Sequence, residues 1–264
     1  MSSDDDADND VRDEKSEPSS GDWRIKTPAF LQVVGPSQSG KSTLIRRLIA
    51  DDGVWDEPFS AVFYCAPDEL PPAQLETLRA SARGKQLTTQ TGERRLPDLG
   101  ELTAAAAAGD GALLFVVDDL LGFDKNLSLM KALATAHSHH HRLSCVYSIQ
   151  NPYAKHAGLD LTTLSRNATG HFVLYQVSDW RVYGLLNGRL FPDKKEFLLK
   201  KLLESQEKYR VPYVFVHTHP RAELPRRYMC RTAMFEGERM FDSPIIFDAE
   251  EERVAPVTHD RRNI

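Results

Sequence analysis

A nine-residue segment, 35–43, constrains this chain more than any other part of its sequence. It matches the pattern G-x-x-x-x-G-K-[ST], follows the apolar run 30–34 and precedes a stretch with helical spacing. That context predicts a loop whose backbone N–H groups and helix N-terminus bind phosphate. Lys41 is expected to reach the β- and γ-phosphates of a nucleotide, and Ser42 to bind Mg²⁺. The residues predicted to bind the nucleotide are Gly35, Pro36, Ser37, Gln38, Ser39, Gly40, Lys41, Ser42 and Thr43.

Two adjacent carboxylates end the most apolar run of the chain. Residues 113–119 predict a buried strand, and Asp118 and Asp119 are its last residues. Acidic side chains at the end of a buried strand are costly unless they meet cations or hydrogen-bond donors. We therefore expect Asp118 to lie beside the magnesium and to contact it through a water. Asp119 is expected to orient or deprotonate an attacking water.

The next predicted strand, 143–150, ends in two amides and is preceded by basic residues. Gln150 either senses a γ-phosphate or holds a water, or it caps a neighbouring turn. The four histidines within 137–141 are too tightly spaced for a metal site and lack a cysteine or carboxylate nearby. Arg142 is either a plain surface arginine or a group that supplies positive charge to a neighbouring subunit's γ-phosphate.

Apolar runs and helical stretches alternate along the chain. This alternation predicts an α/β fold with a mostly parallel central sheet covered by helices on both faces. Together with the loop 35–43 it is expected to be that of a P-loop NTPase (RecA-like/ASCE). Ligands bind such sheets beyond the carboxyl ends of the strands, where each polar motif is expected to lie. Segment 83–96 is polar and predicts a surface loop. The predicted strands are 30–34, 61–65, 113–119, 143–150, 171–177, 212–217 and 228–235, and the predicted helices are 42–51, 73–82, 99–108, 126–139, 180–190 and 193–209.

Charge divides the chain into regions. Residues 1–22 hold nine Asp or Glu and two Lys or Arg, with few large apolar side chains, and predict a disordered acidic tail. An ATPase domain over 23–248 and a polar C-terminal tail over 249–264 complete the predicted organisation. Within the domain, residues 181–231 hold twelve basic and five acidic residues. This excess is typical either of a solvated surface or of a face that contacts phosphate backbones.

Other features limit where such a protein works. No stretch of about 18 apolar residues exists, so no membrane span is expected. The acidic start does not fit a secretory signal, and an intracellular protein is expected. Cys65 and Cys145 lie in apolar runs, where a thiol behaves as a small hydrophobe. With Cys230 they form a sparse, odd set that fits neither a disulfide framework nor a zinc site.

Taken together, the motifs resemble a known family. The loop G-P-S-Q-S-G-K-S-T, the strand ending in Asp118-Asp119, the S-H-H-H-R run and the strand ending Q-N-P-Y occur in an order and spacing similar to genome-packaging ATPases of the FtsK/HerA superfamily. The resemblance is to those of Polinton-like viruses and relatives of large DNA viruses, and it covers about residues 31–216. Ile149 stands where relatives often carry a hydroxyl residue. The arginine of a K-N-P-R-D run is displaced to Arg181.

The resemblance implies functions for these residues. Lys41 and Ser42 would bind ATP and Mg²⁺, Asp118 and Asp119 would form the acidic pair, and Gln150 would be the sensor. Arg142 would act across a subunit boundary. The superfamily implies a homo-oligomeric ring, usually a hexamer, that moves double-stranded DNA without reading its sequence. The viral branch implies loading into capsids, a capsid-protein partner and a location at the viral assembly site of an infected cell or in the virion.

Three other functions remain open from the residues. A small-molecule kinase shares the loop, but its only candidate for an arginine lid is Arg94-Arg95. A nucleotide-bound switch or scaffold would hydrolyse little, and the N-K-x-D and L-S-G-G-Q signatures are absent from the sequence. A HerA-like helicase or DNA-partition motor would share every motif named above.

Overall fold

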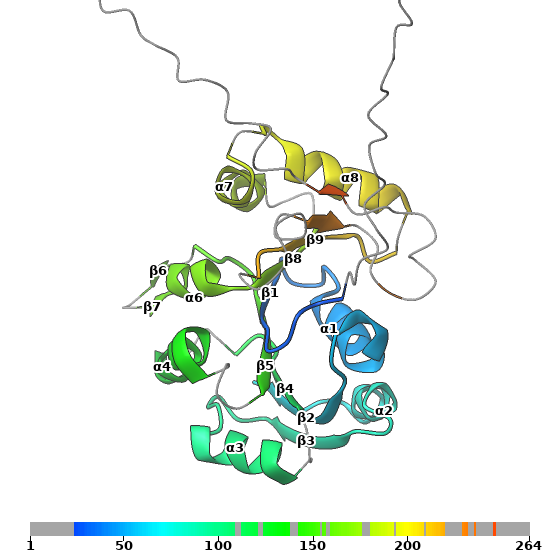
Figure 1. The fold of residues 1–264 in the computed structure, drawn as a ribbon, viewed down its shortest axis with the longest axis vertical. Helices are drawn as coiled ribbons and strands as arrows, with labels where there is room; N and C mark the ends of the chain where they lie inside the picture. The colour runs from blue at the N-terminus through cyan, green and yellow to red at the C-terminus, as the bar shows by residue number, and fades with distance from the viewer. Residues whose placement is uncertain are drawn as a thin grey trace, which may run out of the picture.

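The computed structural model describes residues 24–108, 112–120, 124–137, 142–153, 155–156, 159–175, 180–192, 194–208, 210–219, 229–231, 235 and 245–246. Within them a nine-stranded sheet runs in the order β11-β10-β9-β8-β1-β5-β4-β2-β3. Helices cover both of its faces (Figure 1). The fold is therefore the predicted three-layer α/β arrangement of a P-loop NTPase.

Six neighbouring strands of this sheet are parallel. The three strands at one edge run antiparallel to their neighbours, and β6 and β7 form a separate pair. The parallel strands are β1 (Phe30–Val34), β2 (Phe59–Ala66), β3 (Gln86–Thr91), β4 (Ala112–Val117), β5 (Leu143–Ile149) and β8 (Gly170–Leu174). The others are β6 (Lys155–His156), β7 (Leu159–Asp160), β9 (Tyr213–His217), β10 (Met229–Arg231) and β11 (Ile245–Ile246).

The strand order determines which polar groups meet. β5 pairs with β1 on one side and with β4 on the other, so an additional strand separates the loop strand from the acidic strand. This arrangement is the one that the ASCE class requires. Because all three strands are parallel, their carboxyl ends meet at one edge of the sheet.

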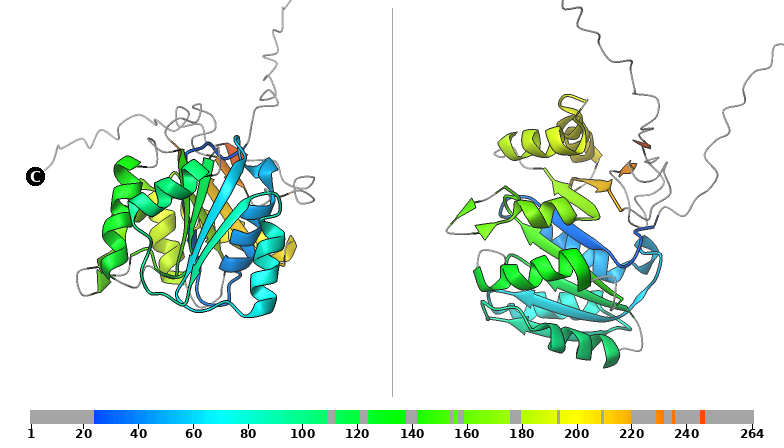
Figure 2. Two further views of the ribbon diagram at one scale, coloured as in Figure 1. Left: turned by 90° about the horizontal axis from the view of Figure 1, so that it is seen from below. Right: turned by 60° about the vertical axis from the view of Figure 1, so that its left-hand side comes forward.

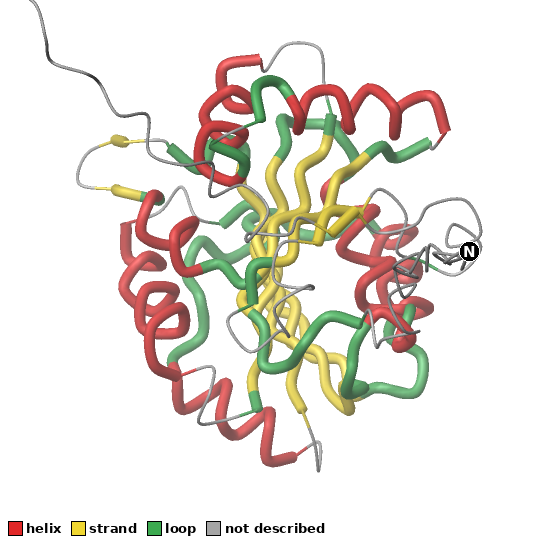
Figure 3. The backbone as a smooth tube through the Cα atoms, turned by 45° about the horizontal axis from the view of Figure 1, so that its top comes forward, coloured by secondary structure: helices red, strands yellow, loops and turns green. Residues whose placement is uncertain are grey.

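Helices cover the two faces unequally (Figures 2 and 3). One face is covered by α1 (Lys41–Ala50) and α2 (Pro72–Ser81), together with the turn η1 (Asp52–Val54). The α1 helix packs through Leu44, Ile45 and Leu48, an apolar stripe at helical spacing. The other face is covered by α3 (Leu99–Ala108), α4 (Asp124–Ala132) with the π-turn η2 (Leu133–His137), α6 (Thr162–Asn167), α7 (Trp180–Leu190) and α8 (Phe197–Lys208).

The central strands are buried because both faces are covered. Every residue of β4 is buried, as its unbroken apolar sequence ALLFVV predicts. Cys65 and Cys145 are buried free thiols within strands, as expected. Leu127, Met130 and Leu133 point into the core at helical spacing. None of the helices that the structure describes is long and apolar enough to cross a membrane.

One predicted loop was wrong. Segment 83–96 contains β3, which pairs in parallel with β2 along its whole length. Its sequence QLTTQT is polar because β3 is an edge strand whose residues are exposed or half-buried. The predicted helix 193–209 begins at Phe197, and α6 was not predicted. Both predicted tails, 1–22 and 249–264, lie outside the described residues.

Candidate nucleotide-binding site

Two glycines set the shape of the loop between β1 and α1. Gly40 has a left-handed φ of 100°, and a Cβ added there would lie 2.8 Å from Val211 Cγ1. A Cβ on Gly35 would lie 2.5 Å from Ser39 Oγ. No side chain caps α1 at Gly40, and the first N–H groups of a helix have no intrahelical acceptor. The N-terminus of α1 is therefore a suitable site for phosphate.

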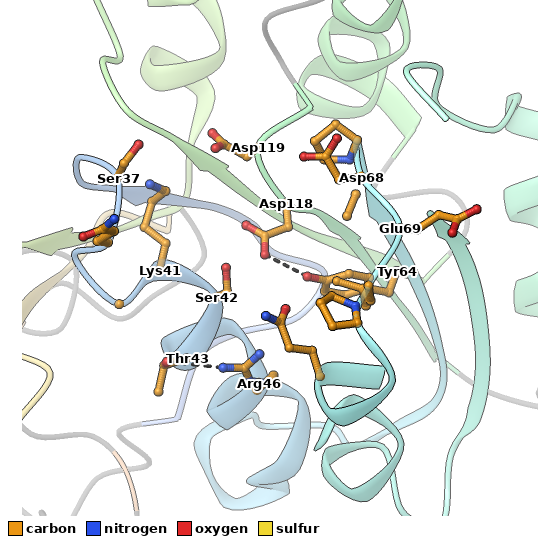
Figure 4. A pocket seen from close by; sticks show the side chains of 17 residues that line it. Ser37, Lys41, Ser42, Thr43, Arg46, Tyr64, Asp68, Glu69, Asp118 and Asp119 are labelled. Atoms are coloured by element: carbon orange, nitrogen blue, oxygen red, sulfur yellow. Dashed lines mark hydrogen bonds between the residues drawn. The ribbon is translucent and has the colours of Figure 1, made fainter. Parts of the chain in front are cut away.

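Lys41 crosses this loop. Its Nζ donates to the carbonyl oxygens of Gly35 and Pro36, at 2.9 Å each. The side chain is 7% exposed. Figure 4 shows Lys41 and Ser42 extending from the start of α1 toward Asp118 and Asp119. The ammonium group therefore lies over the loop, and its contact with phosphate oxygens stays a prediction.

The acidic pair is tied to both neighbouring strands. Tyr64 OH on β2 donates to Asp118 Oδ2 at 2.8 Å, and Ser148 Oγ on β5 donates to Asp118 Oδ1 at 2.6 Å. Asp119 is exposed and has a left-handed φ of 60°. Its N–H donates to Ser148 Oγ at 2.9 Å. Non-glycine residues in this conformation are uncommon and are concentrated at functional sites.

The Tyr64 hydroxyl is a permanent donor in this arrangement. Burial, and then the negative charge of the Asp118 carboxylate, raise the pKa of Tyr64 far above its usual value. The phenol therefore stays protonated well above neutral pH and donates to Asp118 there.

Gln150 lies between the loop and the acidic pair. It follows β5, and its Nε2 donates to Ser37 Oγ at 3.2 Å. The side chain is exposed. The backbones of the loop and of β5 are also joined here, because Gly35 N–H donates to Ile149 O at 3.2 Å. The Gln150 amide is thus bonded to the loop through Ser37, and its role as a sensor stays a prediction.

Lys41, Ser42, Tyr64 and the acidic pair line a cavity of about 650 Å³. The volume suits a nucleotide. Ser42 and Asp118 supply the hard oxygen donors that Mg²⁺ prefers. Within the described part of the chain, no group of three or more His, Cys, Asp or Glu could hold a metal alone, so substrate phosphates would complete the ligand set. The cavity is lined by Ser37, Gln38, Gly40, Lys41, Ser42, Thr43, Arg46, Tyr64, Ala66, Pro67, Asp68, Glu69, Leu70, Pro71, Gln74, Asp118 and Asp119.

Arg142 does not join this site within one chain, and its expected role across a subunit boundary stays a prediction. It precedes β5 and therefore lies at the amino edge of the sheet. Seven residues of β5 separate it from Gln150, which is about 23 Å of extended chain. Its exposed guanidinium donates from Nη2 to Glu57 Oε2 at 2.9 Å. The side chains of the preceding histidines lie outside the described residues.

Sequence reasoning missed several residues of the site. Tyr64 and Ser148 lie within strands and resemble core positions, although their spacing places them on the same face as Asp118. Arg46 was missed one helical turn after Ser42. Asp68 and Glu69 follow β2 and line the cavity, and the end of an apolar strand was a usable signal for them.

The basic residues of segment 181–231 are of two kinds: some are bonded within the protein, and others are exposed. Arg189 is half-buried and donates to Ser165 Oγ and to the Ser165 carbonyl, so it belongs to the interior. Lys201 is likewise engaged, because its Nζ forms an ion pair with Glu204 Oε2 at 2.7 Å. Among the residues of this segment that the structure describes, five exposed basic residues lie on or beside α7 and α8, and we call this set the α7–α8 basic face: Arg181, Lys195, Lys200, Lys208 and Arg210.

No family model and no curated protein matches the chain. It is similar to the solved genome packaging NTPase B204 from Sulfolobus turreted icosahedral virus 2 in complex with ATP-gammaS, with 12% identity, 72% of this chain and 92% of that chain covered, and a TM-score of 0.44. It is also similar to the assembled ATPase EscN from the enteropathogenic E. coli type III secretion system, with 13% identity, 64% and 46% covered, and a TM-score of 0.34. At such low TM-scores neither likeness carries an argument about function.

Proposed function

We propose that this protein is an ATPase that uses hydrolysis to move double-stranded DNA into a viral capsid. One observation carries the ATPase part: the carboxyl ends of β1 and β4 bring Lys41 and the acidic pair around one cavity, and Gln150 at the end of β5 reaches it through Ser37, which lines that cavity. Each residue type in that set has a separate task in phosphoanhydride hydrolysis. A fold alone would not support this, because function depends on the site.

The residues divide the reaction between them. Lys41 and the N–H groups at the start of α1 bind the phosphates and stabilise negative charge that develops on them. Mg²⁺ held by Ser42 and Asp118 would neutralise further charge on the β- and γ-phosphate oxygens. Asp119 accepts a proton from the attacking water or orients it. Gln150 contacts the terminal phosphate and reports its loss to the loop through Ser37.

The α7–α8 basic face supports the DNA part of the proposal. Its exposed cations are placed to bind phosphate backbones without reading bases. Arg210 precedes Val211, whose side chain packs against Gly40 of the phosphate loop. A change in the loop on hydrolysis would therefore press directly on the segment that carries this basic face.

The position of Arg142 supports a ring. In one chain it is at the opposite edge of the sheet from Lys41. A head-to-tail contact between identical subunits places different surfaces together and closes into a ring when the rotation allows. Such a contact would bring Arg142 of one subunit to the phosphates of the next, where an arginine contributes roughly 10³–10⁵ in rate. A hexamer, a capsid protein as partner and a place at the viral assembly site complete the proposal.

The first experiment measures steady-state ATP hydrolysis with and without double-stranded DNA. DNA is expected to stimulate the native protein, Lys41→Ala to abolish turnover, and Arg142→Ala to lower it about 10³-fold while ATP still binds. A mixture of the two variants should recover activity, because some interfaces then join an intact Lys41 to an intact Arg142. The control Glu57→Ala, which removes only the ion-pair partner of Arg142, should change stability by less than about 1 kcal/mol and keep turnover.

Two outcomes would contradict the proposal. Turnover that is indifferent to DNA would leave an ATPase without a DNA substrate. A mixture no more active than its components would rule out a ring contact in which Arg142 acts on the next subunit.

Double substitution of Lys200 and Lys208 by Ala should also reduce the dependence of DNA affinity on salt by about one unit of slope per lost phosphate contact. Lys131→Ala on α4 is the matched control.

Packaging itself has a separate test. Capsids assembled with the native protein should contain DNA that resists nuclease, and those assembled with Lys41→Ala should not. DNA movement on naked substrates without any filling of capsids would favour a helicase or partition motor instead.

A further inference from the structure

The Asp118 carboxylate is held from both sides by hydroxyl groups on the two strands that neighbour β4. Tyr64 on β2 donates to Oδ2, and Ser148 on β5 donates to Oδ1. The strands are aligned so that Asp118 N–H donates to Cys65 O at 2.9 Å. Figure 4 shows Asp118 between Tyr64 and Ser42, with the hydrogen bond to Tyr64 drawn. Asp118 itself is 6% exposed.

Two donors have a physical consequence that one donor would not have. The terminal torsion of an aspartate is broad and roughly two-fold, so an unrestrained carboxylate samples many orientations. A donor on each oxygen fixes the plane of the carboxylate, and each oxygen keeps a lone pair for a further contact. Asp118 and Ser42 line the same cavity, so a cation bound there can reach both side chains.

Ser148 differs from Tyr64 in its second contact. Its Oγ also accepts the N–H of Asp119, so one hydroxyl joins both acids and supports the left-handed backbone of Asp119. The Tyr64 hydroxyl, by contrast, donates to the first acid, Asp118. Loss of Tyr64 OH should thus disturb Asp118 alone. Loss of Ser148 Oγ should disturb both acids.

We propose that Tyr64 and Ser148 are positioning residues that hold the Asp118 carboxylate toward Ser42 for Mg²⁺ binding, and that Ser148 also positions Asp119 for water activation. This inference rests on the proposed ATP hydrolysis and is independent of DNA, of the ring and of the capsid. The two residues are expected to differ in what they affect. Tyr64 affects the affinity for Mg²⁺, whereas Ser148 affects both the affinity for Mg²⁺ and the chemical step.

The test titrates free Mg²⁺ against binding of a fluorescent ATP analogue, beside the same titration in EDTA, and then measures kcat at saturating Mg²⁺. Tyr64→Phe is expected to raise the half-saturating Mg²⁺ concentration about tenfold. Binding in EDTA should be unchanged, and kcat should recover at high Mg²⁺. Ser148→Ala is expected to show the same shift together with a kcat that stays low. Ser148→Thr restores the hydroxyl and should restore both.

The controls are the same substitutions elsewhere in the sheet. Tyr147→Phe removes a fully buried phenol on the other face, and Ser144→Ala removes a buried hydroxyl near the opposite end of β5. Neither should change the Mg²⁺ titration. A Tyr64→Phe titration identical to that of the native protein, or an equal loss of binding in EDTA, would overturn the inference while leaving hydrolysis intact. A native protein whose ATP binding does not depend on Mg²⁺ would overturn this inference, and one that does not hydrolyse ATP would overturn both proposals.

Discussion

Two polar clusters lie on opposite faces of the same sheet, and they differ in whether they open into a cavity at the strand ends. The first, on the face covered by α1, comprises Tyr64, Asp118 and Ser148 and opens into the cavity beyond the strand ends. The second, on the other face, is a row of fully buried side chains from three neighbouring strands: Gln32, Tyr147 and His171. We call these the open cluster and the sealed cluster.

The sealed cluster is closed by helices. Ser165 of α6 donates to Gln32 Oε1 at 3.1 Å, and His171 Nδ1 lies 3.0 Å from the same oxygen. Arg189 of α7 donates to Ser165. Burial, and then the charge of Arg189, lower the pKa of His171 to about 3. Polar residues in a buried strand thus do not by themselves define a site, since access at the strand end distinguishes the open cluster.

The largest effect on ATP turnover is expected beside the open cluster, in the phosphate loop. Lys41→Ala should lower ATP turnover by at least about 10²–10³-fold, because charge developing on the phosphates loses its cation. The midpoint of thermal unfolding should barely change. Steady-state hydrolysis and calorimetry check both, with Lys131→Ala on α4 as the control. A large loss of stability would mean that Lys41 supports the folded structure, and it would contradict the contrast drawn between the two clusters.

The reverse pattern is expected for the sealed cluster. Arg189→Ala should cost about 2 kcal/mol of unfolding free energy, because Ser165 loses a charged donor in a half-buried site. The thermal midpoint should fall by about 4–8 °C. Turnover per folded molecule should be unchanged. A fall in kcat with unchanged stability would show that the two clusters are coupled.

Acid should act on the sealed cluster through His171. Its pKa in the folded protein is about 3, well below the unfolded value of about 6.5, so the unfolded chain binds the extra proton first. Stability is therefore fully present above about pH 6.5 and is lost as the pH falls toward 3, by at most about 1.4 kcal/mol per pH unit from this group. Urea unfolding of His171→Gln beside the native protein should give a shallower slope across that window. Equal slopes would contradict the assignment.

The smallest effect is expected for Tyr147→Phe. Removing this buried hydroxyl should change the unfolding free energy by less than about 1 kcal/mol, because the replacement keeps the ring and the shape. Denaturant unfolding measures the change. A loss above about 2 kcal/mol would show that the sealed cluster depends on that hydroxyl.

The sequence predicted some elements better than others. The loop, β4 and the helix 180–190 were predicted closely, since each has a strong local pattern. The edge strand β3 was predicted as a loop because its threonines and glutamines carry no apolar alternation, and only its pairing with β2 makes it a strand. Arg189 was counted with a basic surface, whereas α7 turns it inward against α6.

Sequence by itself determined the chemistry at this site: the glycines and lysine of the loop, the two acids after an apolar strand and the amide after the next. Each is a local pattern, because backbone conformation and burial along one strand depend on neighbouring residues. Only the tertiary structure decided that β5 lies between β1 and β4, that Tyr64 and Ser148 flank Asp118, and that Arg142 lies at the far edge. Those relations depend on strand order, and strand order is set by how the helices pack on both faces of the sheet.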